Sequence, residues 1–496
     1  MTLSIASNDK SPEDSKVELN SDLESSQDDR KKQERKLVRI LDARMTMLMF
    51  IFIFNYIDRT NIATARLGGL EDELHLDASK QEFSTLLSIF YAGYIFMMIP
   101  SYVEKTLSSE LSYNDAILQK HAFTSARETI NISPSVLSAM VNHITLYCFT
   151  GAVLCRFFLG FVEAAFLPGA LFTLASWYTR EELGLRTSLM WCGLLVSIPF
   201  GQLLASGILD TMGGIGGYSA WRWVFFIEGI ISFAISIPAF FILPDFPNSE
   251  SSKRWLDPEL LQIALKRKEE EMVDLAKIPD VTQKEGLFLA VRDWRVWWFA
   301  LAVGAYQLTQ GYYQYFPTIA ATLGYNNTIS LLLAAPPGFV SAIFTFFVSR
   351  HSDKVQKRFP HIVLSLGISV IGLIMAMCSM KIAVRYTAMF LMQAIPAGFV
   401  VIMAWVSNTI TTPPAKKAVA LGLIVACSQL GSFAGAYVFP RHWGPQYTIS
   451  FGITIASAVF TVLLCFILRM HLASQNKKAE EAVKQNPELR PYMYQL

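Results

Sequence analysis

Charge is scarce in this chain. Of its 496 residues, 17% are charged and 52% are hydrophobic. A soluble globular protein usually carries about 25% charged residues. The scarcity therefore argues against an ordinary soluble domain. The net charge of +2 says little by itself, so the positions of the charges matter more.

Sequence signatures of metal and redox chemistry are also missing. The six cysteines form no Cys-x-x-Cys pair, and the seven histidines form no His-Glu-x-x-His motif. Cysteines scattered through apolar stretches behave as small hydrophobic packing residues, so we expect them to be reduced. No nucleophile or paired-acid constellation is visible. We therefore expect no cofactor, no metal site and no enzymatic activity.

Long apolar stretches are what the chain has in abundance. A stretch of about 20 apolar residues spans a bilayer as a helix, because lipid offers the backbone no hydrogen-bond partners. The sequence predicts an all-α membrane protein with twelve spans, in six-span halves at 45–243 and 293–470. The spans are 45–64, 84–103, 129–147, 149–174, 185–208, 221–243, 297–319, 328–349, 361–380, 384–407, 416–438 and 449–470.

Three polar segments flank the spans, and their charges predict the orientation. Residues 1–44 are polar and lack the apolar core of a signal peptide, so we expect a disordered segment followed by an uncleaved signal anchor. The linker 244–292 and the tail 471–496 are rich in lysine and arginine, whereas the loop after the first span is acidic. Because basic loops stay in the cytoplasm, we expect both termini and the linker there.

The third span is the weakest of the twelve. Residues 129–147 are only moderately apolar and include Asn131, Asn142 and His143, and the preceding residues 104–128 carry seven charges. Without this span the basic residues of 180–186 and 253–268 would face the outside. The distribution of positive charge therefore favours a marginal third helix over a missing one.

Charged residues inside the spans are costly in lipid and usually functional. The first span ends with Asn55, Asp58 and Arg59, which are either a snorkelling pair near the outer interface or part of a cavity wall. Arg156 and Glu163 are seven residues apart and share one helix face, with Gly160 between them. They either lock helices together or form an anion site with a proton-titrating carboxylate, since a carboxylate in a low dielectric holds its proton more readily.

The seventh span is rich in amphipathic side chains. Gln307 and Gln310 share a face at a spacing of three, so we expect both in a cavity wall. The later residues Tyr312, Tyr313 and Tyr315 fit an aromatic belt at the membrane surface.

Several segments resemble the major facilitator superfamily, and within it the fungal anion:cation symporters that include allantoate, nicotinate, pantothenate and biotin permeases. The matching residues are 58–62, 65–70, 154–165, 221–229, 352–354 with Arg358 and His361, 413–416 and 443–445. The resemblance implies proton-driven uptake of a small organic anion by alternating access between two six-helix halves. It covers residues 37–100 and 147–470. It leaves open which carboxylate or ureide is the substrate.

The resemblance and the intramembrane polar residues together suggest roles. We expect Arg156, Arg59, Gln307, Gln310 and Asn55 to bind substrate, and Asp58 and Glu163 to couple protons. Arg156 corresponds to the arginine of the superfamily's fourth-helix motif. Asp353 and Lys354 correspond to its loop motif, so with Arg358 they are expected to form a gating loop. The expected partners are the anion, the proton and a lipid bilayer, with no nucleic acid, for a monomer in the plasma membrane.

One departure and two alternatives remain. Residues 102–143 lack the loop motif and the apolar third helix of the family, which fits either divergence or, as we favour, a gene-model artefact such as a translated intron. Efflux transporters of the superfamily carry a Gly-Pro-Gly-Gly-like signature in the fifth helix, which residues 193–202 do not match. A transporter-like nutrient sensor is the other alternative, although such sensors usually have longer cytoplasmic extensions.

Overall fold

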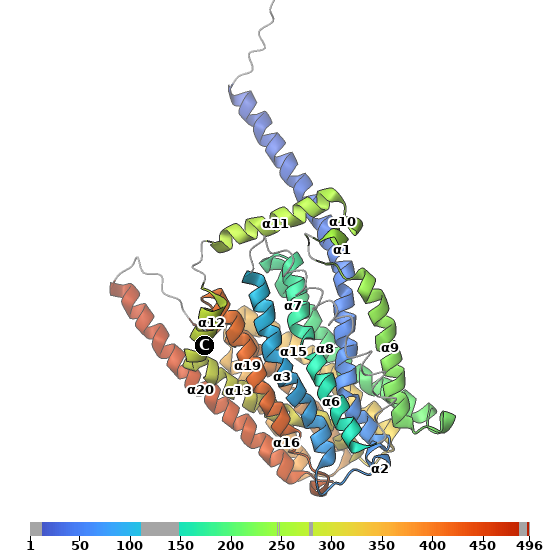
Figure 1. Ribbon diagram of the computed structural model, residues 1–496. Coiled ribbons are helices and arrows are strands. Elements are labelled where there is room, and N and C mark those ends of the chain that lie inside the picture. Colours follow the sequence, from blue (N-terminus) through green and yellow to red (C-terminus); the bar gives the residue numbers. More distant parts are fainter. Residues whose placement is uncertain are drawn as a thin grey trace, which may run out of the picture.

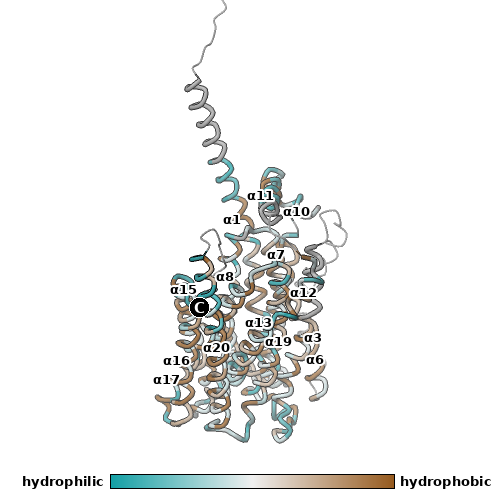
Figure 2. Tube along the Cα trace, turned by 90° about the vertical axis from the view of Figure 1, so that its left-hand side faces the viewer, coloured by the Kyte–Doolittle hydropathy of each residue, from teal (hydrophilic) through white to brown (hydrophobic). Residues whose placement is uncertain are grey.

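The computed structural model describes residues 12–110, 148–245, 247, 249–276, 281–485 and 494–495. These residues form helices and connecting loops, with no strand among them. Most of the helices run side by side in one elongated bundle, and the two helices within residues 250–276 lie at one end of it (Figure 1). Figure 2 shows apolar residues along the body of the bundle and polar residues at that end.

The N-terminal half of the bundle holds the first set of helices, both long and short. They are α1 (Pro12–Leu67), α2 (Leu70–Glu73), α3 (Glu82–Glu110), α6 (Phe149–Glu163), α7 (Phe166–Trp177), α8 (Arg180–Thr211), η1 (Ile215–Gly217) and α9 (Ala220–Ile242). The predicted span 149–174 is thus broken between α6 and α7, directly after Glu163.

The linker and the C-terminal half follow. The linker forms α10 (Glu250–Trp255), α11 (Pro258–Ala276) and α12 (Gln283–Arg292). The half after it comprises α13 (Trp294–Thr309), η2 (Gln310–Tyr315), α14 (Phe316–Ala321), α15 (Asn327–Val355), α16 (Phe359–Cys378), α17 (Ile382–Met392), α18 (Ile395–Thr409), α19 (Pro414–Gly435), η3 (Arg441–Trp443) and α20 (Thr448–Gln485).

The helices agree with the predicted spans. Among the described residues, 8 helical stretches are long and apolar enough to cross a membrane, and Glu82–Met98 is a shorter apolar helix. Every predicted span except one coincides with a helix or with consecutive helices. The exception is 129–147, which lies outside the described residues. The all-α membrane architecture expected from the sequence is therefore confirmed.

The expectation of a disordered segment up to residue 44 differs from the structure. The first helix begins at Pro12 and runs without a break to Leu67. Leu37 and Leu41 are buried in a cluster with Leu256 and Leu260 of the linker. Arg30 also pairs with Glu270, at 2.7 Å. These partners lie more than 200 residues away, so the sequence of 1–44 alone does not reveal the contacts that support its helix.

An ion pair and a hydrogen bond join the two halves at one end of the bundle. We call the end with α10 and α11 the linker end and the end with α2 the far end (Figure 1). At the far end, Glu71 pairs with Arg66 of α1 at 2.9 Å and with Arg441 at 3.4 Å, across the two halves. Asn327 donates to the carbonyl oxygen of Leu67 at 2.6 Å, again between halves.

Small residues let helices approach closely. A Cβ atom on Gly160 of α6 would overlap the carbonyl oxygen of Phe90 on α3, so no larger residue fits there. In the C-terminal half, a Cβ on Gly311 of η2 would lie 2.9 Å from the Cα of Gly435 at the end of α19. Between the halves, α8 packs against α15 and α3 packs against α19.

Candidate functional site: a charged cavity between the two halves

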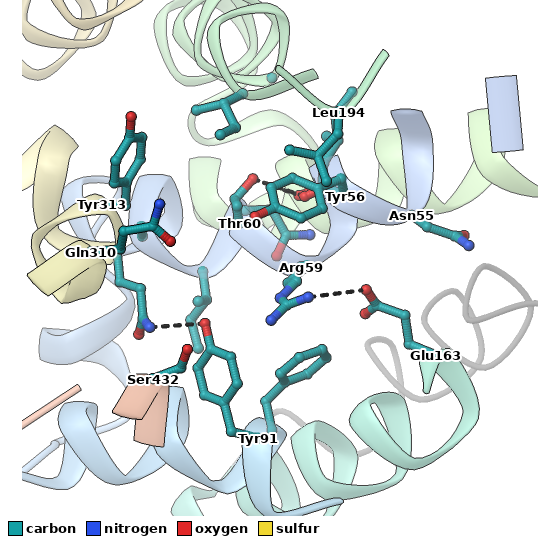
Figure 3. A pocket seen from close by; sticks show the side chains of 18 of the residues that line it. Asn55, Tyr56, Arg59, Thr60, Tyr91, Glu163, Leu194, Gln310, Tyr313 and Ser432 are labelled. Atoms are coloured by element: carbon teal, nitrogen blue, oxygen red, sulfur yellow. Dashed lines mark hydrogen bonds and ion pairs between the residues drawn. The ribbon is translucent and has the colours of Figure 1, made fainter. Parts of the chain in front are cut away.

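A cavity of about 220 Å³ lies between the halves. Its walls come from helices α1, α3, α6, α7, α8 and α9 on one side and from α13, η2, α14, α18 and α19 on the other. Figure 3 shows Arg59 extending from α1 toward Glu163, with Tyr91 nearby and Gln310, Tyr313 and Ser432 across the cavity. Apolar walls with a few convergent polar groups are typical of small-molecule sites.

The end of α1 supplies one wall of the cavity. Asn55 and Arg59 are four residues apart, so they share a helix face, and both line the cavity. Asp58 is 2% exposed and accepts a hydrogen bond from Ser232 Oγ of α9 at 3.2 Å. The expected cluster at the end of the first span is therefore buried inside the bundle, which fits a cavity wall and not a snorkelling pair.

Arg59 is the cation most enclosed by aromatic rings. Its Nη1 lies 3.7 Å from Glu163 Oε1 on α6. Its guanidinium carbon lies within 4.8–5.5 Å of the ring centroids of Tyr56, Phe90, Tyr91 and Tyr94. Cation–π contacts of this length stabilise a desolvated guanidinium. Arg59 is thus held inside the cavity wall, and among the described residues Glu163 is its ion-pair partner.

Arg156 is bound by groups of α1. Its Nη2 donates to Asn61 Oδ1 at 3.1 Å, and its Nη1 donates to the carbonyl oxygen of Arg59 at 3.3 Å. Arg156 and Glu163 share the buried face of α6, as their spacing predicts. The ion pair of Glu163, however, is with Arg59 of another helix.

Glu228 of α9 is a wall residue that the sequence reasoning did not select. It is 1% exposed, lines the cavity and accepts a hydrogen bond from Asn61 Nδ2 at 3.0 Å. The signal was available, because Glu228 is a carboxylate inside the apolar span 221–243. Asn61 belongs to the matching segment 58–62, and its spacing alone does not indicate a role in the cavity.

The C-terminal half contributes uncharged polar groups. Gln307 and Gln310 line the cavity as expected, together with Tyr313, Gln314, Gln429 and Ser432. Three of these side chains come from η2, where the seventh span leaves the α-helical form. Gln314 Nε2 donates to Tyr91 OH at 2.9 Å and so connects the two walls.

The tyrosines expected in an aromatic belt are instead inside the protein. Tyr312 and Tyr315 are at most 1% exposed, and Tyr313 lines the cavity. Tyr315 donates to the carbonyl oxygen of Ala436 at 2.5 Å, and Tyr312 donates to that of Met392. The belt interpretation was wrong because the break at η2 turns these rings toward neighbouring helices.

The expected gating loop lies at the linker end and does not line the cavity. Arg358 Nη1 donates to Asp353 Oδ1 at 2.5 Å and to Ser352 Oγ at 3.1 Å. Arg358 Nε also donates to Gln495 Oε1 at 3.1 Å, near the end of the chain. Lys354 lies in the last turn of α15, on the exposed surface. The arrangement joins α15, the start of α16 and the C-terminal residues.

Comparison with known proteins identifies the family. The sequence model of the Major Facilitator Superfamily matches residues 129–436, more than half of the chain. The chain belongs to the major facilitator superfamily. It is therefore a multi-pass membrane transporter, as the apolar spans and the resemblance indicated.

Several curated relatives of this transporter are fungal. It is 25% identical to the MFS-type transporter cnsO of Penicillium expansum, over 90% of this chain and 84% of that protein. It is 25% identical to the major facilitator-type transporter hxnP of Emericella nidulans, over 90% and 88%. It is 24% identical to the high-affinity nicotinic acid transporter of Saccharomyces cerevisiae, over 92% and 81%.

Solved structures agree on the fold. A bacterial homologue of the lysosomal transporter Spinster, inward-facing and unoccupied, matches with a TM-score of 0.59 at 15% identity, over 86% of this chain and 95% of that one. The inward-open xylose transporter XylE from E. coli matches with a TM-score of 0.59 at 16% identity, over 85% and 95%. The major facilitator fold expected from the sequence is confirmed.

Proposed function

We propose that this transporter takes up a small organic anion together with protons. The observation that carries the proposal is the ion pair of Arg59 and Glu163 inside an aromatic-lined cavity. A substrate carboxylate that enters the cavity competes with Glu163 for the guanidinium of Arg59. Glu163 is then left without its cation, and in a low dielectric a carboxylate in that position takes up a proton.

The charges around the cavity also favour proton uptake. Arg59 and Arg156 face three carboxylates, those of Asp58, Glu163 and Glu228. With every group ionised, this set carries one negative charge more than it can neutralise. An uncompensated buried charge is costly, and a bound anion adds another. Binding of an anion is therefore favourable only when protons accompany it.

The proposed substrate class is a small carboxylate or ureide, such as nicotinate, allantoate or pantothenate. A cavity of about 220 Å³ suits a small molecule, and its aromatic rings suit a flat one. The relative described as a high-affinity nicotinic acid transporter supports a carboxylate. Arg156, Asn55, Gln307 and Gln310 are proposed to contact the substrate alongside Arg59.

Alternating access is the proposed mode of transport, in a monomer of the plasma membrane. Because the linker end carries the basic segments, we propose that it faces the cytoplasm, together with both termini. The contacts of Glu71 with Arg66 and Arg441 then close the outer side between the halves. The loop of Asp353, Lys354 and Arg358 is proposed to control opening on the cytoplasmic side.

The decisive experiment is uptake of radiolabelled carboxylates and ureides by cells that express the chain. We expect uptake to rise as external pH falls from about 7.5 to about 5, and to stop when a protonophore is added. Glu163→Gln mimics the protonated residue and should flatten the pH response. The matched control is Glu285→Gln, at an exposed site of α12 outside the cavity.

Two results would contradict the proposal. Uptake that is independent of pH and of the protonophore excludes proton coupling. Proton-dependent loss of a preloaded substrate, without uptake of any tested anion, would instead indicate the efflux alternative.

A further inference from the structure

The amide of Asn61 lies between two charged side chains of the cavity wall. Its Nδ2 donates to Glu228 Oε2 on α9 at 3.0 Å, and its Oδ1 accepts from Arg156 Nη2 on α6 at 3.1 Å. Asn61 is 3% exposed and Glu228 is 1% exposed, so water does not readily substitute for either bond. One amide thus connects three helices.

The two bonds depend on each other, because an amide has one donor end and one acceptor end. Glu228 accepts and therefore holds the nitrogen of Asn61 toward α9. The oxygen of Asn61 must then point toward Arg156, which can only donate. If Glu228 were replaced by an apolar residue, the amide could rotate and turn its nitrogen toward the guanidinium.

A second contact fixes the same pair of helices. Ser232 lies one turn after Glu228 on α9, and its Oγ donates to Asp58 Oδ2 at 3.2 Å on α1. Asp58 is one turn before Asn61. Two hydrogen bonds, one turn apart, therefore hold α9 against α1. The Asn61 side chain is left with little freedom other than rotation of its amide.

We propose that Asn61 and Glu228 are positioning residues that hold Arg156 in place for the transported anion. Glu228 orients the Asn61 amide, and the amide orients the guanidinium of Arg156. Neither residue needs to touch the substrate. The inference rests on the proposed anion uptake, because Arg156 is the group whose position matters.

The charged groups around Glu228 shape the test. Asp58 of α1 and Arg156 of α6 act electrostatically on Glu228. Arg59 and Glu163 line the same cavity. The Asn61→Asp substitution would keep an acceptor for Arg156 but would set a second carboxylate against Glu228, and two such carboxylates must share a proton.

Exchange of the polar groups separates positioning from packing. In the Asn61→Asp variant we expect KM to rise about tenfold and uptake to become more dependent on acidic pH, as the carboxylates are forced to share a proton. In the double variant Asn61→Asp with Glu228→Gln, the nitrogen of the new glutamine can donate to the new aspartate, whose other oxygen accepts from Arg156. We expect this double variant to recover most of the wild-type KM and pH profile.

Single substitutions of Glu228 supply an independent comparison. Glu228→Gln and Glu228→Leu both remove one negative charge from the cavity wall, but only the glutamine keeps an oxygen that accepts from Asn61, so the two variants differ in the acceptor and not in charge. Glu228→Leu also removes the acceptor, and its KM should be about tenfold higher than that of Glu228→Gln. All rates are divided by the amount of transporter at the cell surface, measured with a tag on the chain.

Equal KM values for Glu228→Gln and Glu228→Leu, or a double variant no better than Asn61→Asp, would overturn the proposal. If Asn61→Asp fails to reach the membrane, the comparison of Glu228→Gln with Glu228→Leu still tests the proposal. Each comparison uses the radiolabelled carboxylate or ureide that the wild-type chain takes up. The positioning role of Asn61 and Glu228 can therefore be rejected while the proposed anion uptake is retained. Failure of the proposed function appears separately, as a wild-type chain that takes up no anion.

Discussion

The two walls of the cavity differ in charge. The N-terminal half supplies Arg59, Arg156, Glu163 and Glu228, with Asp58 directly behind them. The C-terminal half faces them with amides, hydroxyls and rings, among them Gln310, Tyr313, Gln429 and Ser432. The N-terminal half thus presents charged groups to the cavity, and the C-terminal half presents neutral polar groups and aromatic rings.

This difference suggests a division of labour. Buried charges respond strongly to protons and to anions, whereas neutral amides and hydroxyls mainly recognise shape and hydrogen-bonding pattern. We therefore expect the N-terminal wall to determine coupling and anion binding, and the C-terminal wall to determine which anion is accepted. Substitutions on the N-terminal wall should then change the rate and pH dependence of uptake, whereas substitutions on the C-terminal wall should change KM and leave the pH profile unaltered.

The largest effect is expected for Arg59→Gln. The change removes the cation that pairs with Glu163 and leaves that carboxylate buried without its ion-pair partner. Arg59 is also the proposed binding group for the substrate carboxylate, and loss of one partner of a buried charge pair weakens binding by about 3 kcal/mol or more, so uptake should fall at least about 100-fold. Initial rates of uptake, corrected for surface amount, provide the measurement.

The matched control for Arg59→Gln is Arg441→Gln, the same exchange at an arginine that is 62% exposed. A normal uptake rate for a well-expressed Arg59→Gln transporter would contradict the proposed role of the N-terminal wall in anion binding.

A smaller loss is expected for Arg156→Lys. The guanidinium donates to two acceptors at once, Asn61 Oδ1 and the carbonyl oxygen of Arg59. A lysine keeps the charge but not the planar fork that serves both acceptors. We expect about tenfold lower uptake at unchanged surface amount, which corresponds to about 1.4 kcal/mol. Normal uptake by this variant would show that charge alone suffices at this position.

A different signature is expected on the C-terminal wall. Gln310→Leu removes a neutral hydrogen-bonding group at the start of η2. The net value of such a bond is about 1 kcal/mol, so KM should rise about fivefold while the pH profile stays that of the wild type. The control is Gln475→Leu on the exposed surface of α20. A shifted pH profile for Gln310→Leu would break the proposed division between the walls.

Much of the fold follows from the sequence because each span needs a continuous apolar length, which is a local property. The contacts of 1–44 were not predictable, since the partners of Leu37 and Leu41 come from the linker. The break at η2 was not predictable either. It occurs where Gly311 meets Gly435 of α19, and no local residue pattern specifies that meeting.

The candidate site was predictable in its residue types but not in its pairs. Spacing along α6 places Arg156 and Glu163 on one face. It cannot say that Glu163 pairs with Arg59, or that Asn61 lies between Arg156 and Glu228. Those partners come from three different helices, so they depend on how the helices pack. A search for every carboxylate inside a span would have found Glu228.

The smallest effect is expected at the far end of the bundle, for Arg441→Gln. The pair of Arg441 with Glu71 joins the halves, but Arg441 is 62% exposed and the atoms are 3.4 Å apart. Exposed ion pairs contribute at most about 1 kcal/mol, and salt screens them. Glu71 also keeps its shorter bond to Arg66, at 2.9 Å. We therefore expect uptake within about twofold of wild type, with an unchanged pH profile. A large loss of uptake would mean that contact between the halves at the far end limits transport more than the charged wall does.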